Sequence, residues 1–405
     1  LRRWRVDGDA GAPARVGGGG AARGFGRAAT SLFVPSTLTA PEYGRYQRWH
    51  VAQDLSTQLR SALATSAVFA GLGLGGTAAS SAAAATVAWL ARDASGMVAS
   101  LAATSRLAPA LDGDARRWRF FGDLCVDAAL LCEIATPHAP RACFLPLLCA
   151  ASVLKALCGV AAGGANAAVA AHWAASSADY AEVAAKGAAI GTVSGLAGLG
   201  LSLAATVAVD RRARAAAAGA KAAASLGLYG VLTALHVVSC GRGLACLALD
   251  KLGCPRRFDV VVDAFERTGF APSPAELAKL DRVAGTPDGG GRAAPSAFLR
   301  AWRRQPARVA AAVAAAGGRY VAVPGRVALL EGASPRDERA ALLHGRALRG
   351  RRDLWRLAPE AFAAAVAAAA PGERAVDALD SAPVSYTHLR AHETRGNLVC
   401  RLLLE

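Results

Sequence analysis

The sequence has few lysines, few aromatic residues and few charges for its length. Its 405 residues include 41 arginines but only five lysines, with 6% aromatic, 19% charged and 54% apolar residues. A typical soluble domain has about 45–50% apolar and about 25% charged residues. The shortage of charge therefore favours a membrane protein, or else an unusually alanine-rich helical bundle. A chain of this length can bury one large core or two smaller ones.

The net charge of +16 does not indicate a nucleic-acid-binding protein. The excess of arginine comes with abundant alanine and glycine, as a GC-rich coding sequence produces. A nucleic-acid interface would need a basic face with interleaved aromatic residues, and no segment has that pattern. We therefore expect no nucleic-acid partner.

The sequence lacks a recognisable catalytic or metal-binding motif. Its nine cysteines form no Cys-x-x-Cys pair, and there is no Gly-x-Ser-x-Gly elbow. The glycines at 71, 73, 75 and 76 lack the Lys-Ser/Thr of a phosphate loop, so helix packing explains them better. We expect no metal and no cofactor, with free, buried thiols in a reducing compartment. His236 lies in an apolar run and is interpreted as a hydrogen-bonded core histidine.

The two ends of the sequence differ from the rest. Residues 1–32 are rich in arginine and glycine and poor in acidic residues, which is typical of an organelle transit peptide or of a disordered extension. Residue 1 is not methionine, so we expect the true start to be missing. Residues 384–405 match the translation of a transposase-type sequencing adapter and a primer site. We interpret them as an artefact, so the His388/His392 pair carries no meaning.

Four long segments carry no charge, at residues 61–91, 156–178, 187–209 and 222–241. A helix crosses the roughly 30 Å hydrocarbon layer with about 20 residues, so these segments are candidate membrane spans. Gly191, Gly195 and Gly198 have the spacing that lets membrane helices approach closely. Asp210 and a cluster of arginines follow, a flank that predicts this end on the negative side of the membrane.

Charge is dense in one segment of the apolar region. Residues 114–134 predict a helix that ends at Thr136-Pro137, because the residue before proline avoids the helical conformation. Residues three and four apart share a helix face, which predicts a stripe of Arg116, Arg119, Asp123 and Asp127 opposite Phe120, Leu124 and Leu131. Arg119 can neutralise Asp123, and the two aspartates could share a proton.

Asp127 and Glu133 lie among apolar neighbours and need partners from other helices. Lys186 is the only basic residue between Lys155 and Arg211. We therefore predict that Lys186 is the counter-charge of these carboxylates. The candidate ligand or structural cluster consists of Arg117, Trp118, Arg119, Asp123, Asp127, Glu133 and Lys186.

Residues 114–123 (DARRWRFFGD), with Asp127, Glu133 and Pro137, resemble the central signature of the root UVB-sensitive (RUS) family. Further similar segments follow the family order: YGRYQRW at 43–49, GLGLG at 71–75, WLARDASG at 89–96, GVAAGGA at 159–165, Ala185-Lys186 and Leu235-His236. The resemblance covers about residues 33–252 and continues more weakly to 349. Val126 and Ala167 replace an asparagine and an arginine of the family pattern. Around Lys186, only Glu182 and Thr192 also keep the family's character.

The segment after residue 252 predicts a different structure. Ser273-Pro-Ala-Glu276 and Ser334-Pro-Arg-Asp337 are helix-start signals, the second of a helix reaching about Arg349. Residues 320–323 and 327–330 predict two short strands, and 285–295 a flexible linker. We expect a small, soluble α/β domain at 253–350 and a helical extension at 351–383, after the RUS-type membrane domain at 33–252.

The fold class expected is thus mainly α, a polytopic alanine-rich membrane bundle followed by the small domain. The resemblance implies a non-enzymatic organellar (plastid or mitochondrial) or endomembrane protein. Its implied role is in vitamin B6 homeostasis or in UV-B and auxin-linked signalling, as a scaffold or carrier. Expected partners are membrane lipid, another RUS-family protein and a small anionic metabolite. The alternatives are a membrane-embedded enzyme and a soluble helical interaction protein, either using Asp123, Asp127 and Lys186.

Overall fold

The structure is a computed structural model that describes residues 33–35, 42–72, 82–111, 113–174, 176–213, 218–249, 255–268, 272–281, 283–284, 303–324, 326–330, 333–373 and 376–377. The expected N-terminal extension (1–32), the linker at 285–295 and the adapter-like tail (384–405) lie outside the described residues.

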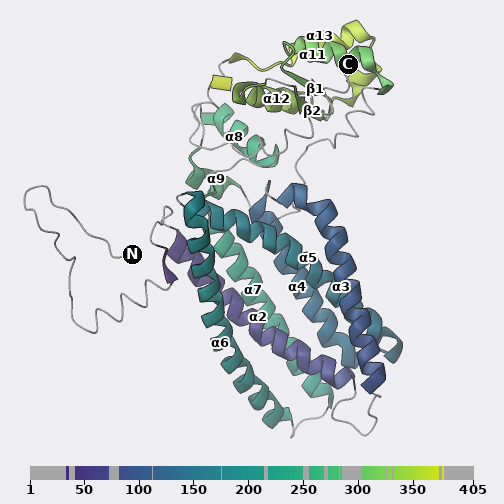
Figure 1. Ribbon diagram of the computed structural model, residues 1–405, viewed down its shortest axis with the longest axis vertical. Coiled ribbons are helices and arrows are strands. Elements are labelled where there is room, and N and C mark those ends of the chain that lie inside the picture. Colours follow the sequence, from purple (N-terminus) through teal and green to yellow (C-terminus); the bar gives the residue numbers. More distant parts are fainter. Residues whose placement is uncertain are drawn as a thin grey trace, which may run out of the picture.

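Six long helices form a bundle at one end of the elongated molecule (Figure 1). In the bundle α2 packs against α7, α6 and α4, while α4 packs against α5, and α3 lies along α5 on the outside. The helices are α2 (Tyr43–Gly71), α3 (Ala82–Leu111), α4 (Ala115–Ala135), α5 (Arg141–Trp173), α6 (Tyr180–Ala213) and α7 (Ala218–Cys246). Two short 3-10 helices, Thr136–His138 and Ser177–Asp179, precede α5 and α6.

Three helical segments among the described residues are long and apolar enough to cross a membrane: Arg141–Trp173, Ser177–Val207 and Ala223–Cys246. They overlap three of the four uncharged runs in the sequence, at 156–178, 187–209 and 222–241. The fourth run, residues 61–91, does not form one helix, because α2 ends at Gly71 and α3 begins at Ala82. Neither α2 nor α3 is among the three apolar spans.

Close packing explains some of the glycines but not all. A Cβ atom on Gly71 would lie 2.8 Å from the Phe144 ring, and one on Gly198 would lie 2.6 Å from Cγ of Gln58. A Cβ atom on Gly191 would meet nothing within 4 Å. The close approach of α6 to α2 is therefore made at Gly198, and Gly191 is not needed for it.

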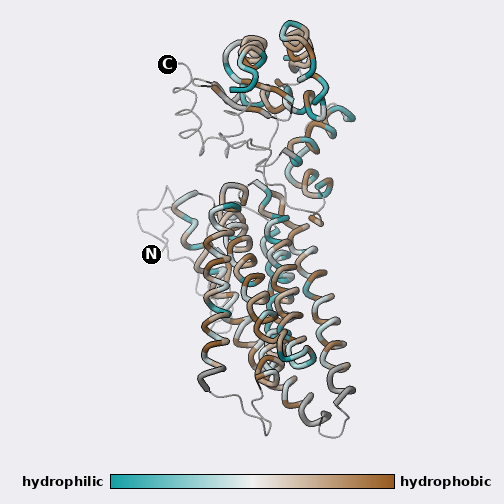
Figure 2. The backbone as a smooth tube through the Cα atoms, turned by 90° about the vertical axis from the view of Figure 1, so that its right-hand side faces the viewer, coloured by the Kyte–Doolittle hydropathy of each residue, from teal (hydrophilic) through white to brown (hydrophobic). Residues whose placement is uncertain are grey.

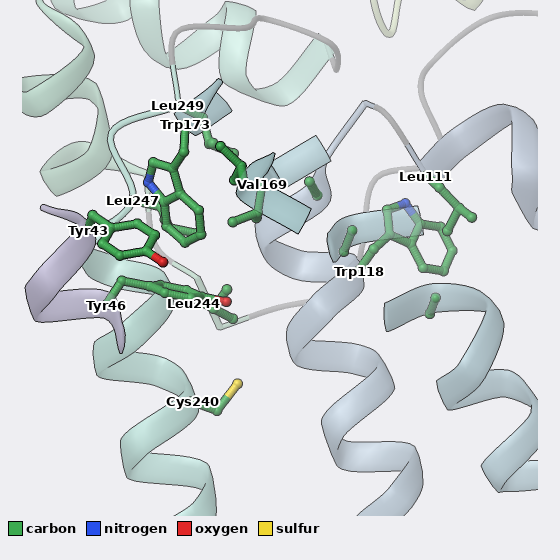
Figure 3. Packing of buried hydrophobic residues seen from close by; sticks show 14 of the residues in the cluster. Tyr43, Tyr46, Leu111, Trp118, Val169, Trp173, Cys240, Leu244, Leu247 and Leu249 are labelled. Atoms are coloured by element: carbon green, nitrogen blue, oxygen red, sulfur yellow. The ribbon is translucent and has the colours of Figure 1, made fainter. Parts of the chain in front are cut away.

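An aromatic cluster holds the beginning of α2 against the ends of α5 and α7 (Figure 3). The ring of Trp173 meets the rings of Tyr43 and Tyr46 edge-on, with centroids 4.9 Å and 4.8 Å away. Leu244 and Leu247 complete this side of the core. The YGRYQRW segment at 43–49 thus supplies two core aromatic residues.

The chain beyond the bundle forms shorter elements. They are α8 (Pro255–Thr268), α9 (Pro274–Leu280), α11 (Pro306–Ala315), β1 (Tyr320–Val323), β2 (Arg326–Leu329), α12 (Pro335–Ala347), the 3-10 helix Arg352–Arg356 and α13 (Pro359–Ala368). Strands β1 and β2 pair antiparallel, from Tyr320 opposite Leu329 to Val323 opposite Arg326. Both predicted capping boxes are present, at Ser273 and Ser334.

The hairpin and helices α11, α12 and α13 share a second apolar core, which we call the C-terminal core. Val321, Ala322 and Val323 of β1 are fully buried in it, together with Leu348 and Phe362. Both strands were predicted to within one residue, and α13 lies within the predicted helical extension. The chain as a whole is mainly helical.

Candidate functional site

A polar interior lies where α2, α4 and α7 meet, which we call the polar core. Its side chains are almost fully removed from the surface although they carry charge or hydrogen-bonding groups. Gln53 and Arg60 come from α2, Arg119, Asp123 and Asp127 from α4, and His236 and Cys240 from α7. Buried polar groups of this kind are stable only when they are hydrogen-bonded or paired.

Asp127 is held from two helices. Nη1 of Arg60 forms an ion pair with its Oδ1 atom, and Nδ1 of His236 lies 3.0 Å from the same oxygen. Arg60 is completely buried and also donates to Thr57 Oγ1 at 3.2 Å. The Tyr229 hydroxyl donates to the backbone carbonyl of Asp127. A residue of α4 is thereby tied to both α2 and α7.

Asp123, one turn earlier on α4, has a separate set of partners. Nε2 of Gln53 donates to its Oδ2 atom at 2.8 Å, and the Cys240 thiol donates at 2.9 Å. Nε of Arg119 lies 3.3 Å away, which confirms the pairing that the spacing predicts. Arg119 also donates to Asn166 Oδ1 on α5 at 3.2 Å.

Each aspartate therefore has its own guanidinium partner, Arg119 for Asp123 and Arg60 for Asp127. Two neighbouring carboxylates share a proton when no positive partner stabilises their ionised forms. The hypothesis of an Asp123–Asp127 proton pair is not supported by this arrangement.

The third acidic residue of α4, Glu133, is bound by side chains from α3 and α5 rather than from α2 and α7. Nζ of Lys155 on α5 donates to its Oε1 atom at 2.6 Å, and Nη2 of Arg92 on α3 lies 3.8 Å from the same oxygen. Glu133 is 4% exposed, whereas the Lys155 side chain is about one third exposed.

Comparison with known proteins gives the family. A family model described as "Vitamin B6 photo-protection and homoeostasis domain" matches residues 21–269, which is more than half of the chain. The chain belongs to the root UVB-sensitive (RUS) family. No solved structure matches it.

Individual RUS proteins match over the same region. The chain is 28% identical over 264 residues to "RUS family member 1" of Dictyostelium discoideum, covering 64% of this chain and 48% of that protein. It is 28% identical over 262 residues to "Protein root UVB sensitive 3" of Arabidopsis thaliana, covering 64% and 56%. "Protein root UVB sensitive 2, chloroplastic" of the same plant is 27% identical over 237 residues, covering 58% and 51%. The chain thus spans about half the length of these curated relatives.

Lys186, the residue predicted to neutralise the carboxylates of α4, does not reach them. Its Nζ atom lies 2.8 Å from Oε1 of Glu182 on the same helix and donates to the Val34 carbonyl at 2.7 Å. The prediction of a Lys186 counter-charge is wrong. It assumed that the nearest cation in an apolar stretch is the partner, but α6 packs on α2 rather than on α4. The cations that bind Asp127 and Glu133 come from α2, α3 and α5.

The first residues of α4, which begin the RUS signature, do not contribute to the polar core. Nε1 of Trp118 donates to the Ala110 carbonyl at 3.0 Å and fixes the turn between α3 and α4. Arg117 lies 3.9 Å from Asp114. Nε of Arg116 donates to the Leu244 carbonyl at 3.0 Å. These residues join the bundle helices at one end and do not line the polar core.

Arg116 also links the bundle to the segment that follows. It donates to the Ala278 carbonyl of α9 at 3.3 Å and lies 3.6 Å from Asp281. Asp281 is bound as well by Arg256 and Arg257 of α8. Arg116 thus attaches α9 to the bundle. The predicted stripe on α4 did not indicate this contact, because α9 is far from α4 in the sequence.

At the same end of the bundle, Glu42 accepts hydrogen bonds from Nε2 of His172 at 3.0 Å and from the Ala248 amide at 3.4 Å. Burial raises the pKa of the Glu42 carboxyl. The hydrogen bonds and the nearby imidazole together lower the pKa by more than burial raises it, so the pKa lies below its usual value. The carboxylate form therefore holds together the beginning of α2 and the ends of α5 and α7.

Sequence analysis missed half of the polar core. Gln53, Ser56 and Arg60 follow an i, i+3, i+7 pattern that puts them on one face of α2, and all three are buried. That pattern is readable from the sequence. Cys240 gave no signal, because a lone cysteine in an apolar helix is usually a small apolar residue. His236 was interpreted correctly as a hydrogen-bonded core histidine.

The polar core consists of ion pairs and hydrogen bonds, and the change open to it is an exchange of ion-pair partners. Within the described residues there is no group of three or more His, Cys, Asp and Glu side chains placed to hold a metal ion. Asp127 and Glu133 are paired with cations from neighbouring helices, so a change of partner at either residue would move one helix relative to another. An enzyme using Asp123, Asp127 and Lys186 together is contradicted, because Lys186 lies elsewhere.

Proposed function

We propose that this chain is a non-enzymatic integral membrane protein that acts as a carrier or scaffold in vitamin B6-related homeostasis. One observation carries the proposal: the bundle buries paired charges inside and exposes large apolar side chains outside. That is the reverse of a soluble protein and is the distribution that a lipid environment favours. The family description supports the vitamin B6 role at the level of the family.

The outer surface of the bundle supports a lipid-facing position. On α3 a stripe of exposed apolar residues includes Leu90 at 64%, Met97 at 69% and Leu101 at 74% exposure. Leu196, Leu199 and Leu203 of α6 repeat the pattern, as do Val231 and Leu235 of α7. Figure 2 shows hydrophobic residues in brown along much of the bundle. Exposed apolar area of this extent is rare on a soluble monomer.

Three of the helices have the length and hydropathy of membrane spans. We propose that α2, α3 and α4 cross with them, because the charges that point into the bundle are paired there: Arg60 with Asp127, Arg119 with Asp123, and Arg92 and Lys155 with Glu133. Asp93 and Arg106 of α3 lie on its exposed surface. A paired charge that faces the bundle interior avoids the cost of an isolated charge in hydrocarbon. The part of the chain around the C-terminal core would then be the soluble domain.

Location and partners are inferred from relatives and composition. One relative carries "chloroplastic" in its name, and we propose an organellar or endomembrane location with lipid as the main partner. A second RUS-family chain and a small metabolite are the further partners proposed. The carrier role is supported by the polar core, whose ion pairs join three helices that would have to move during transport.

Fractionation tests the membrane part of the proposal. After expression, the full chain should stay in the membrane pellet through an alkaline carbonate wash and be released by detergent. Protease should free a soluble fragment containing the C-terminal core. Release of the chain by carbonate alone would contradict membrane integration and favour a soluble helical bundle.

Reconstitution tests the carrier part. Liposomes containing the full chain should take up labelled pyridoxine faster than empty liposomes, and Arg60→Leu should abolish the difference. Arg349→Leu, which changes an exposed residue of the segment beyond the bundle, is the matched control and should leave uptake unchanged. Equal uptake with and without the parent chain would contradict a carrier and leave the scaffold role.

A further inference from the structure

A groove of about 630 Å³ lies between α2 and α6. Its polar lining consists of one amide and five hydroxyl groups, from Gln58, Ser61, Thr65, Ser66, Ser202 and Thr206. The apolar part of the lining includes the Phe69 ring and the Leu199 side chain. The volume is within the range of about 300–1,000 Å³ typical of small-molecule sites. The lining contains no charged residue.

Ser202 is a buried polar residue in the wall of the groove, and its hydroxyl oxygen is closed off from the groove in this conformation. It is only 7% exposed, and its hydroxyl has no hydrogen-bond partner among the described residues. A buried hydroxyl without a partner is unfavourable, because it has lost its hydrogen bonds to water. Most serines in apolar helices avoid this by donating to the preceding turn, as Thr206 does to the Ser202 carbonyl at 2.8 Å. Ser202 makes no such bond and lies in the wall of the groove.

The groove exists because α2 and α6 are close only over part of their length. Oγ of Ser194 donates to Asp54 at 2.9 Å, and Gln58 packs over Gly198. Beyond Gly198 the α6 residues that face α2 are larger, and the space is bordered by Ser202 and Thr206. The apolar span of α6 ends at Val207, so the groove lies near one end of that span. Figure 1 places these halves of α2 and α6 at the lower end of the bundle.

The hydrogen-bonding pattern defines the ligand. Thr65 and Thr206 donate to backbone carbonyls of their own helices, so their oxygens remain able to accept. Ser202 can donate. A ligand hydroxyl satisfies both requirements, since it donates and accepts. A phosphate or carboxylate would be desolvated here without a counter-ion and is disfavoured.

We propose that the α2–α6 groove binds an uncharged, hydroxyl-bearing small molecule with a flat ring that lies against Phe69 and Leu199. This inference rests on the proposed function and names its substrate class: the neutral rather than the phosphorylated vitamer. It differs from the small anionic metabolite that the resemblance implies, because the lining of the groove contains no cation.

Equilibrium dialysis of the full chain in detergent tests the site with labelled pyridoxine as the probe. The parent should bind it, and pyridoxal 5′-phosphate should compete at least tenfold less well. Ser202→Ala removes one hydrogen bond and should weaken binding about two- to tenfold. Ser66→Trp, at an exposed position on the rim, should abolish binding by filling the groove. Thr192→Val, on α6 outside the groove with its hydroxyl bonded to Ala188, should bind like the parent.

The possible results distinguish a failure of the groove proposal from a failure of the proposed carrier function. If pyridoxine does not bind the parent, or if Ser202→Ala and Ser66→Trp both bind like Thr192→Val, the groove proposal is overturned. Liposome uptake that persists in Ser66→Trp would show that the carrier function stands and that the substrate passes elsewhere. If dioleoylglycerol in nanodiscs displaces pyridoxine stoichiometrically and pyridoxine shows no saturable binding without detergent, the groove is a lipid site and the small-molecule proposal is overturned.

Discussion

The bundle and the C-terminal core solve the same packing problem in opposite ways. In the bundle, Arg60 is completely buried while Leu101 of α3 is 74% exposed. Around the C-terminal core, Val321 and Phe362 are completely buried, and Arg346 of α12 lies over α8, where Asp263 and Glu266 are more than half exposed. Teal, hydrophilic residues are frequent in this part of the chain in Figure 2.

The difference shows which solvent each part is built for. In water, burying an apolar side chain stabilises a fold by about 25 cal/mol per Å², and the C-terminal core follows that rule. In a bilayer the surroundings are as apolar as leucine, so helix association depends on close packing and on polar contacts. The ion pair of Asp127 with Arg60, the hydrogen bond from Gln53 to Asp123 and the approach at Gly198 are contacts of this kind.

The largest expected effect comes from breaking the polar core. Arg60→Leu leaves Asp127 with His236 as its remaining side-chain partner and should destabilise the bundle by about 3–5 kcal/mol. Arg60→Leu with Asp127→Leu should recover much of that loss. Arg349→Leu, in a partly exposed pair with Asp259 (53% and 21% exposure of the two side chains), should cost less than about 1 kcal/mol. Unfolding in mixed micelles measures all three; equal losses for Arg60→Leu and Arg349→Leu would contradict the contrast between the two regions.

A smaller effect should come from closing the approach of α6 to α2. Gly198→Val puts a Cβ atom 2.6 Å from Gln58 Cγ and 2.7 Å from its Cβ atom, and overpacking of this kind costs about 1–3 kcal/mol. Gly191→Val on the same helix meets nothing within 4 Å at its Cβ and is the matched control. Melting temperatures in detergent should fall for the first variant only. A larger fall for Gly191→Val would show that the approach is made elsewhere on α6.

The C-terminal core should be the pH-sensitive region near neutrality. Burial lowers the pKa of His344, and the hydrogen bond to the Val366 carbonyl raises it only in part, so the net shift is downward. The unfolded histidine titrates near about 6.5. Below that pH the unfolded state takes up a proton that the folded state resists, so stability falls as the pH decreases, by at most about 1.4 kcal/mol per pH unit.

Hydrogen exchange of β1 and α12, corrected for intrinsic rates, measures this effect in the full chain. The opening free energy should decrease between pH 7 and pH 5. His344→Gln should remove most of the pH dependence. A stability that rises as the pH falls would contradict the sign of the pKa shift.

The smallest effect should come from Lys186, in contrast with the prediction from the sequence. Its ion pair with Glu182 is partly exposed, with 18% and 33% exposure of the two side chains. Such pairs contribute about 0–1 kcal/mol. Lys186→Ala should therefore melt within about two degrees of the parent, whereas Lys155→Ala, which leaves Glu133 with the more distant Arg92, should lose more. A larger loss for Lys186→Ala would restore it as a partner of the α4 carboxylates.

Much of the local structure could be predicted from the sequence, because its signals act over a few residues. The predicted α4 began and ended within one residue of the observed helix. The predicted reason for its end was wrong, because Thr136 keeps helical dihedral angles (φ −54°, ψ −44°) and the chain continues through Pro137 as a 3-10 helix. The capping boxes at Ser273 and Ser334 form by contacts across three residues. The Arg119–Asp123 pair follows from one helical turn.

The partners of buried groups were decided by the tertiary structure alone. The amino-acid order was enough to predict apolar helices around 156–241 and to predict that Asp127 and Glu133 need partners. The sequence did not show that α2 crosses α4 at Arg60 and Asp127, or that Lys155 and Arg92 reach Glu133. It also did not show that Lys186 of α6 lies away from the carboxylates of α4. The order of residues along a helix sets which side chains share a face. The packing of helices far apart in the sequence sets which faces meet, and it depends on side chains from every helix at once.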